Sequence, residues 1–384
     1  MIDFKIYSSV AELPKSWDPL VGHDIFLQQG YLKALEKASP SNITWYYIGF
    51  FENEMLVGVG IFQRVQLYLE DIFRNPDDHC LEQRFKNLVS KILKGNVLVV
   101  GNLMHTGQHG LYFKQEIPGK NRVEIILKAL SSLEKIIKKE SGKTIRLLLF
   151  KDYFEDDGIH SQSEIFDQHS IYKVTAQPNM IMSVQSNWHS MEDYVGSLNK
   201  KYRRRYKTAI KKSHGIVRRE LTLEEIELHC KELYQLYKNV CDNAKINTFI
   251  LPEGHLYHLK LQLGERFKVM GYFLDETLIG FYTLILNGDI LETYFLGYDS
   301  AHQYENQLYL NMLYDMAKFG IEHSFSSIVY ARTAMEIKSS VGAKAIPMSM
   351  YMKHTNGLLN VLLQQIFKLM NPSTEWEERH PFQQ

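Results

Sequence analysis

Two side chains that could exchange protons with a substrate, Glu292 and Tyr294, lie two positions apart. The segment 289–296 alternates as a β-strand does, so both side chains are predicted on the same face of a sheet. A carboxylate can accept a proton and a phenol can return one, so we predict Glu292 as a general base and Tyr294 as a general acid. The alternative is a carboxylate that is exposed on the sheet or paired with the basic helix predicted at 198–213.

A second candidate base lies in the glycine-rich loop 101–110 (GNLMHTGQHG), which contains His105 and His109. We predict His109 as the base, with His105 as the other choice, although a histidine that only bonds the loop backbone is the commoner arrangement. Histidines four apart suit a metal site on a helix, but here they lie in a loop without a third ligand nearby, so no metal is predicted. The backbone N–H groups of the loop could instead bind an anion.

A strongly basic helix is predicted at 198–213, where KKYRRRYKTAIKK (200–212) has eight basic residues among 13 and no acidic one. We predict that it binds an anionic group such as a cofactor phosphate, with lipid head groups, RNA or a solvated face as alternatives. Further anion contacts are expected at the carboxyl end of a strand predicted at 327–331. The predicted donor- or phosphate-binding residues are Arg203, Arg204, Arg205, Lys207, Tyr298, Arg332 and Lys338. Beside them, Thr333 and Glu336 match a helix capping box, which predicts a structural role for Glu336.

The composition narrows the class of protein. The 384 residues contain 44 Lys and Arg against 44 Asp and Glu, so the formal net charge is zero, which argues against a surface that binds nucleic acid everywhere. Three widely spaced cysteines, Cys80, Cys230 and Cys241, predict neither a disulfide framework nor a cysteine metal site. Because no segment has the pattern of a membrane span or a signal peptide, we expect a cytoplasmic protein.

The chain contains an internal repeat. Residues 45–65 (WYYIGFFENEMLVGVGIFQRV) and 267–287 (FKVMGYFLDETLIGFYTLILN) align at a constant offset of 222 residues, and both predict a β-hairpin. A strand, a loop, an amphipathic helix and another strand follow each hairpin, with the helices predicted at 121–140 and at about 305–323. We therefore predict a mixed α/β (α+β) fold with two related domains, residues 1–185 and 186–384.

The C-terminal segment 357–371 (GLLNVLLQQIFKLMN) predicts an apolar helix that is too short to span a bilayer. A helix buried against the body of the protein is the expectation. The alternative is an interfacial helix that brings the protein to a lipid substrate.

Several of these segments resemble a known family. MEDYVGSLNKKYRRRYKTAIKK resembles the start of the acyltransferase domain in Fem-like members of the GNAT superfamily, and GYDSAHQYENQLYLNMLYDMAKFG with IVYARTAMEIKSSVGA resembles its end. DIFLQQGYLKALEKASP resembles peptidoglycan biosynthesis-type N-acyltransferases. The resemblance covers nearly the whole chain and implies two tandem GNAT-like (acyl-CoA N-acyltransferase) domains. It also implies transfer of an acyl or aminoacyl group to an amine that is held in the cleft between the halves or in the second half.

One segment departs from that family. Typical acetyl-CoA GNAT domains have an Arg/Gln-x-x-Gly-x-Gly/Ala loop around the CoA pyrophosphate, whereas the segment 297–305 has a single glycine. We expect acyl-CoA or a related donor such as an acyl-carrier protein or an aminoacyl-tRNA, and nucleic acid is a partner only in the last case.

The resemblance and the residues together predict an N-acyltransferase that acts on an amine of a cell-envelope precursor. The amine belongs to a peptidoglycan-type peptide or to an amino-lipid, and peripheral membrane contact stays an open alternative. The rival hypothesis is a catalytically inactive double-GNAT binding module that recognises an anionic envelope component or nucleic acid.

Overall fold

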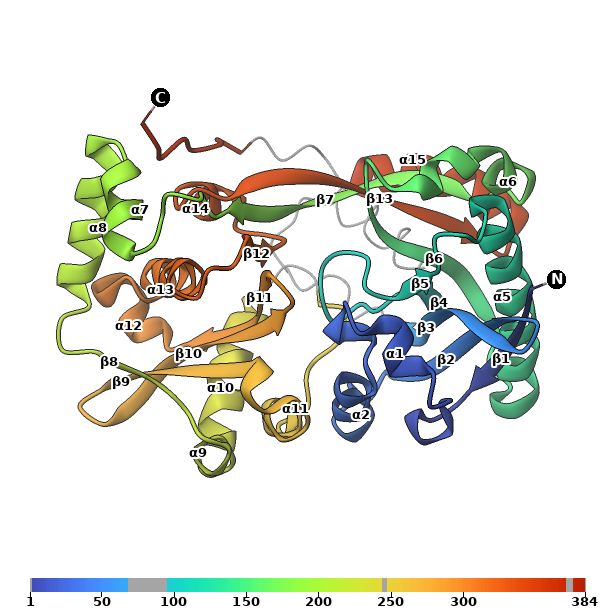
Figure 1. Ribbon diagram of the computed structural model, residues 1–384, viewed down its shortest axis with the longest axis horizontal. Helices are drawn as coiled ribbons and strands as arrows, with labels where there is room; N and C mark the ends of the chain where they lie inside the picture. Colours follow the sequence, from blue (N-terminus) through green and yellow to red (C-terminus); the bar gives the residue numbers. More distant parts are fainter. Residues whose placement is uncertain (1, 68–94, 244–246, 371–375, 384) are drawn as a thin grey trace, which may run out of the picture. The chain divides into compact units, whose positions relative to one another are not determined.

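The computed structural model describes residues 2–67, 95–243, 247–370 and 376–383, so Cys80 lies outside the described part. The chain forms two compact units, each with a sheet and packed helices (Figure 1). The first unit comprises Met1–Gln177, Ala244–Leu251 and Pro347–Ser373, and the second comprises Pro178–Asn243, Pro252–Ile346 and Thr374–Gln384. The predicted division at residue 185 gives contiguous domains, whereas these units are interleaved along the chain.

The sheet of the first unit has the strand order β1-β2-β3-β4-β6-β13, in which β4 and β6 are parallel and the other neighbours are antiparallel. The helix predicted at 121–140 is α5 (Gly119–Ser141), whose apolar stripe joins the core of this unit. The strands are β1 (Ile2–Tyr7), β2 (Ile43–Glu52), β3 (Met55–Leu67), β4 (Gly95–Val100), β5 (Leu111–Phe113), β6 (Ile145–Phe154) and β13 (Lys344–His354), of which residues 348–354 pair with β6. The other helices are α1 (Trp17–Val21), α2 (Gln29–Lys37), α6 (Ser163–Gln168) and α15 (Gly357–Met370).

The sheet of the second unit has the order β7-β12-β11-β10-β9-β8, and again one central pair, β11 with β12, is parallel. The strands are β7 (Tyr172–Ser183), of which residues 180–183 pair with β12, β8 (Val217–Glu220), β9 (Phe267–Leu274), β10 (Thr277–Asn287), β11 (Ile290–Tyr298) and β12 (Ser327–Ala331). The helices are α7 (Met191–Ser197), α8 (Lys200–Lys212), α9 (Leu223–Leu228), α10 (Cys230–Asp242), α11 (His255–Leu263), α12 (Ser300–Asn306), α13 (Leu308–Glu322) and α14 (Met335–Ser339). Short 3-10 helices occur at Val10–Glu12, Ile25–Leu27, Gly158–Gln162 and Gly264–Arg266.

The hairpins β2–β3 and β9–β10 share two irregular features. Their two turn residues have φ angles of 48° and 65° in the first hairpin and 47° and 63° in the second. Both hairpins also have one extra residue in the second strand, at Val57 of β3 and at Ile279 of β10. A turn and a bulge at the same positions of both copies support the repeat that the sequence predicts.

Two helix predictions need correction. The helix predicted at about 305–323 is divided, because Gln307 has a left-handed φ of 50° between α12 and α13. The predicted capping box of Thr333 is wrong: α14 begins at Met335, and its N-cap Ala334 provides no side-chain hydrogen bond. Thr333 itself has a φ of 64°, and Glu336 pairs with Arg379 instead.

The basic helix and the C-terminal helix are both present, as α8 and α15. Asn199 caps α8 by accepting hydrogen bonds from the first N–H groups of the helix. In α15, Leu363 is buried whereas Leu358 and Val361 are exposed, so the described part is amphipathic rather than buried all round. None of the helices in the described ranges has the length and apolar character needed to cross a bilayer.

Candidate active site

The parallel strands β11 and β12 diverge in the sheet of the second unit. They pair only over Ile290–Glu292, opposite residues 327–329. Beyond Glu292, β11 continues beside β10, whereas β12 continues beside β7. A wedge therefore opens between the two strands toward their carboxyl ends, which is the edge where α/β sheets collect ligands.

A β-bulge in β11 lies inside this wedge. Between its pairs with Leu284 and Tyr282 of β10, β11 has one residue more than β10 has. The Thr283 hydroxyl donates a hydrogen bond of 2.7 Å to the carbonyl oxygen of Phe295 in the bulge. The rings of Tyr294 and Phe295, although successive in the chain, both lie beside α11. The bulge thus redirects side chains at the position where the two strands separate.

Tyr294 forms a hydrogen-bonded pair with His255, the first residue of α11. The Tyr294 hydroxyl lies 3.2 Å from Nε2 of His255, and the two rings stack with centroids 5.9 Å apart at 26°. His255 is 1% exposed whereas Tyr294 is partly exposed, so this pair can pass a proton between a buried imidazole and a phenol that solvent or substrate can reach. No pattern along the sequence points to His255, because it is 39 residues from Tyr294 and belongs to no motif.

Glu292 lies two residues before Tyr294 on β11, just ahead of the bulge. Only 6% of its surface is exposed, so the exposed-carboxylate alternative is wrong. A carboxyl group buried to this extent must be paired, hydrogen-bonded or protonated. Each of those states keeps Glu292 in a defined position at the start of the wedge.

The chain leaves β12 through a strained turn. Ala331, Thr333 and Ala334 have left-handed φ angles of 58°, 64° and 47°, a conformation that costs a residue with a side chain on the order of 1 kcal/mol. The Lys338 ammonium group in α14 donates hydrogen bonds to the carbonyl oxygens of Ala331 (3.2 Å) and Arg332 (2.5 Å). Burial lowers the pKa of Lys338 to about 7. Lys338 therefore points into the protein, where it supports the turn, and Arg332 is part of that turn.

In the first unit, the predicted loop 101–110 is tied to β6. The Lys151 ammonium group donates to the carbonyl oxygens of His105 (2.7 Å) and Gly107 (3.3 Å) and forms an ion pair with Asp152. The N–H of Gly107 in turn donates to the Asp152 carboxylate at 3.2 Å. The backbone N–H groups of Leu103, Met104 and Gly110 also donate hydrogen bonds to side-chain oxygens. These internal bonds leave little of the loop backbone to bind an external anion.

The predicted base His109 pairs with a carboxylate of the same unit. Its Nδ1 lies 2.8 Å from Oδ2 of Asp24, and the two side chains are 18% and 12% exposed. Burial raises the pKa of Asp24, but the charge and hydrogen bond of His109 and the N–H of Phe26 outweigh it, and the net pKa is lowered. For His105, burial first and then His109 and Lys151 lower the pKa well below its usual value. Of the two histidines, His109 has the geometry of an oriented base, and Asp24 is a partner that the sequence analysis missed.

Comparisons with known proteins bear on the fold. No protein-family model matches the chain, and no curated protein matches it. The solved structure of FemX matches 94% of this chain and 100% of its own, with 11% identity and a TM-score of 0.55. A tandem GNAT protein from the clavulanic acid biosynthesis pathway matches 93% of this chain and 99% of its own, with 9% identity and a TM-score of 0.51. The chain has a tandem GNAT fold.

This tandem GNAT fold has a helix, α12, between β11 and α13, where the sequence lacks the glycine-rich loop. The side-chain oxygen of Gln303 in α12 accepts a hydrogen bond of 2.9 Å from the N–H of Tyr309, in the first turn of α13. One of the N–H groups at the start of α13 that could bind a phosphate is therefore already hydrogen-bonded to a side chain. Tyr298, predicted to bind the donor, lies beside this turn with its ring 6.3 Å from that of Tyr309, and burial raises its pKa.

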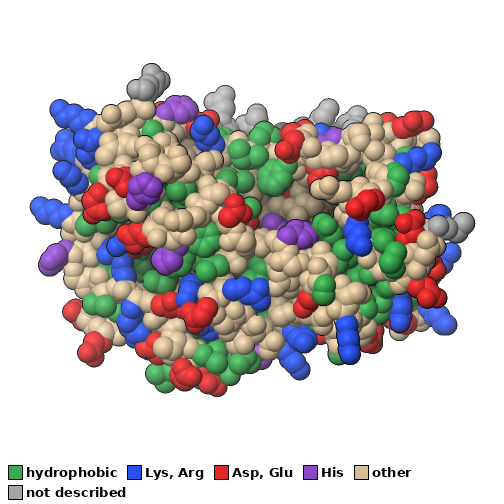
Figure 2. Space-filling view, viewed as in Figure 1, with side chains coloured by type: hydrophobic (Ala, Val, Ile, Leu, Met, Phe, Trp, Pro, Cys, Tyr) green, Lys and Arg blue, Asp and Glu red, His purple; other side chains and the backbone are tan. Residues whose placement is uncertain are grey.

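The predicted basic residues of α8 have different surroundings. Arg203 caps α7 by donating to the carbonyl oxygens of Gly196 (3.0 Å) and Leu198 (2.8 Å), which ties its guanidinium to the backbone. Arg204 and Lys207 are exposed. Figure 2 shows Lys and Arg side chains gathered at the left edge of the molecule, where Figure 1 places α8. Arg205 lines a pocket of the GNAT-like second unit and stands apart from the other three.

Proposed function

We propose that the chain is an N-acyltransferase of the tandem GNAT type and that the wedge between β11 and β12 is its reaction site. The observation that carries the proposal is the Tyr294–His255 pair, with His255 and Glu292 buried and Tyr294 partly exposed, at the start of that wedge. Chemically different groups held next to a break in the sheet are typical of a site that moves protons. The tandem GNAT fold is consistent with this assignment.

In the proposed reaction, the nitrogen of an amine attacks the acyl carbonyl of the donor. The N–C bond forms and the bond between the acyl carbon and the donor sulfur or oxygen breaks. Glu292 takes the proton that the nitrogen loses, and Tyr294 supplies the proton that the leaving group needs. After transfer, Glu292 releases its proton to water and His255, hydrogen-bonded to Tyr294, relays a proton taken from water to the phenolate, so both groups regain their starting states and the protons balance over one turnover.

The first unit contributes a second proposed base, His109. A carboxylate on Nδ1, here that of Asp24, orients the imidazole and stabilises its protonated form. His109 would accept a proton from the ammonium form of an acceptor that binds to the first unit. Its role can be separated from that of Glu292, because the two residues belong to different units.

The proposed donor is acyl-CoA or a related acyl or aminoacyl carrier, and the proposed acceptor is an amine on a cell-envelope precursor. The presence of α12, whose Gln303 accepts a hydrogen bond from the N–H of Tyr309 in the first turn of α13, argues against the usual pyrophosphate loop and favours a donor held in another way. A peptidoglycan-type peptide and an amino-lipid are the two acceptor classes. The exposed apolar side chains of α15 are compatible with the lipid class.

Transfer assays with the full-length protein test the proposal. The protein is incubated with acetyl-CoA, long-chain acyl-CoA, acyl-carrier protein or aminoacyl-tRNA and an amine acceptor, and N-acylated product is measured by mass spectrometry. Product from any donor supports a transferase. The absence of product together with unchanged thermal stability for every donor would favour the inactive binding module. Lipid and muropeptide profiles of a deletion strain then separate the two acceptor classes.

A further inference from the structure

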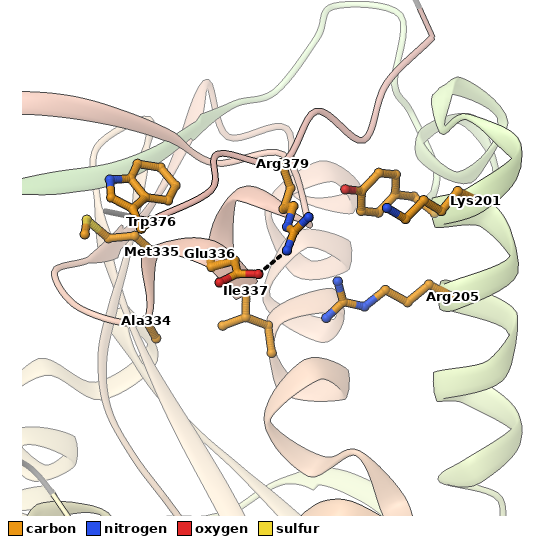
Figure 3. Close-up of a pocket in the computed structure, with 9 residues that line it drawn as sticks. Lys201, Arg205, Ala334, Met335, Glu336, Ile337, Trp376 and Arg379 are labelled. Atoms are coloured by element: carbon orange, nitrogen blue, oxygen red, sulfur yellow. Dashed lines mark hydrogen bonds and ion pairs between the residues drawn. The ribbon is translucent and has the colours of Figure 1, made fainter. Parts of the chain in front are cut away.

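A pocket of about 520 Å³ lies in the second unit between α8, α14 and the C-terminal segment 376–383 (Figure 3). Three of its lining side chains are basic, Lys201, Arg205 and Arg379, and one is acidic, Glu336. Only Arg205 belongs to the predicted donor-binding residues. The volume suits a small molecule rather than a single ion.

The positive charge of the pocket is only partly balanced. Arg379 is paired with Glu336 and Glu377, as the dashed line to Glu336 shows in Figure 3. Lys201 and Arg205 form no ion pair with an acidic side chain anywhere in the described ranges. They lie four residues apart on α8, so they share one face of the helix and both reach the pocket. Two positive charges are therefore available to a ligand.

The wall formed by the C-terminal segment is firmly attached to the second unit. The N–H of Asn199 donates to the carbonyl oxygen of Pro381 (2.8 Å), and the N–H of Arg379 donates to the Ser339 hydroxyl (3.0 Å). The ring of Phe382 lies so close to Gly342 that a Cβ atom there would approach it to 2.4 Å. The opposite wall, α14, is supported by Lys338. A pocket with walls held in this way is organised before a ligand binds.

We propose that this pocket binds the phosphate or pyrophosphate group of a nucleotide-type substrate. The planar guanidinium of Arg205 can bind two phosphate oxygens at once, and the Lys201 ammonium adds a second charge, which together match a doubly charged phosphate group. Trp376, which is partly exposed, provides aromatic surface for the uncharged part of the ligand. The inference rests on the proposed function only in naming the ligand a substrate.

Calorimetric titration with inorganic pyrophosphate, ADP, UDP and coenzyme A tests the inference without turnover. We expect pyrophosphate and at least one nucleotide to bind, with an affinity that falls as the salt concentration rises. The double variant Lys201→Gln/Arg205→Gln should weaken pyrophosphate binding at least about tenfold, the loss of one charge-assisted bond or more. A preference for coenzyme A over UDP assigns the site to the donor, and the reverse assigns it to a nucleotide-linked acceptor.

Two further variants make the test specific to this pocket. Lys211→Gln/Lys212→Gln removes the same charge from the exposed end of α8 and should leave pyrophosphate affinity within about twofold. Glu336→Gln removes the acidic side chain of the lining and should tighten binding severalfold, a gain that misfolding cannot produce.

Equal weakening by both double variants, or binding of tRNA without binding of pyrophosphate or any nucleotide, would overturn the inference. Acyl transfer by a protein that does not bind pyrophosphate would overturn the pocket and keep the transferase. Pyrophosphate binding without acyl transfer would do the reverse.

Discussion

Both units bury a lysine near the carboxyl ends of their central parallel strands, but in different surroundings. Lys151 of the first unit is 2% exposed and Lys338 of the second is 5% exposed. The ammonium group of Lys151 is neutralised by the adjacent Asp152 and also holds the loop 101–110. That of Lys338 bonds backbone carbonyl oxygens, and no carboxylate in the described ranges pairs with it.

The parallel strands next to these lysines also differ, in how far along their length they stay paired. β4 and β6 stay paired up to the last residue of β4, Val100 opposite Phe150, and the tied loop follows. β11 and β12 separate after Glu292 and leave a wedge beside a strained turn. The two copies thus share a scaffold. At the carboxyl ends of the central parallel strands, the first copy has a buried Lys151–Asp152 ion pair and a tied loop, whereas the second copy has the wedge between β11 and β12. The open copy is the better place for group-transfer chemistry.

The largest effect is expected when the buried ion pair of the first unit is broken. Asp152→Asn keeps the shape of the side chain but leaves the Lys151 charge buried without its carboxylate, which should lower the free energy of unfolding by about 3–5 kcal/mol. Urea unfolding measures this loss, and the additional change Lys151→Met should recover part of it. Lys173→Gln, which breaks an exposed pair with Glu155, is the control and should cost at most about 1 kcal/mol. Similar losses in both variants would mean that Asp152 does not neutralise Lys151.

The wedge of the second unit is tested by Glu292→Gln. If Glu292 is the general base, the turnover number for N-acyl transfer should fall by about 10²- to 10⁴-fold with little change in donor affinity. Asp289→Asn, an exposed acid just before the same strand, is the matched control. Wild-type turnover in Glu292→Gln would remove this residue as the base and favour His109.

Lys338→Met should destabilise the turn after β12 by about 1–3 kcal/mol at pH 9, because two carbonyl oxygens lose their donor. The pKa of Lys338 is about 7 in the folded protein and near 10.5 in the unfolded chain, so between these pH values only the unfolded chain carries the proton. The contribution of Lys338 to stability should therefore rise from pH 7 to about pH 10 and be lost as the pH falls through 7. The free energy of unfolding, measured with denaturant at several pH values from 7 to 10, should rise less steeply with pH in Lys338→Met than in the wild type. An equal rise in both proteins would contradict the lowered pKa of Lys338.

The smallest change in stability is expected from substitutions in the two hairpin turns. Glu54 and Glu276 have φ angles of 65° and 63°, a region that glycine occupies at little cost. Glu54→Gly and Glu276→Gly complete Asn-Gly and Asp-Gly turns, and each should stabilise its unit by about 0.5 kcal/mol. Opposite signs in the two variants would mean that the turns, although alike in backbone, are held by different surroundings.

Much of the fold can be predicted from local patterns. The hairpins, the stripe of α5 and the basic run of α8 follow from residues that are neighbours along the chain or one helical turn apart. Boundaries were less accurate where the backbone enters the left-handed region, as at Gln307 and Thr333, because no local pattern required it there. The offset of 222 residues between the copies predicted two related units but not the exchange of segment 347–373.

The sequence by itself determined two related α/β units, the strand that carries Glu292 and Tyr294, and the charge of α8, whereas the tandem GNAT fold was implied by the family resemblance. These properties depend on side-chain type and short spacing, which act before the chain is compact. Only the tertiary structure decided that His255 meets Tyr294, that Asp24 meets His109 and that Arg379 meets Glu336, over separations of 39, 85 and 43 residues. It also decided that Lys338 lies inside the protein and Arg205 lines a pocket. Partners and burial of this kind arise from packing between elements, and no pattern along the chain encodes them separately.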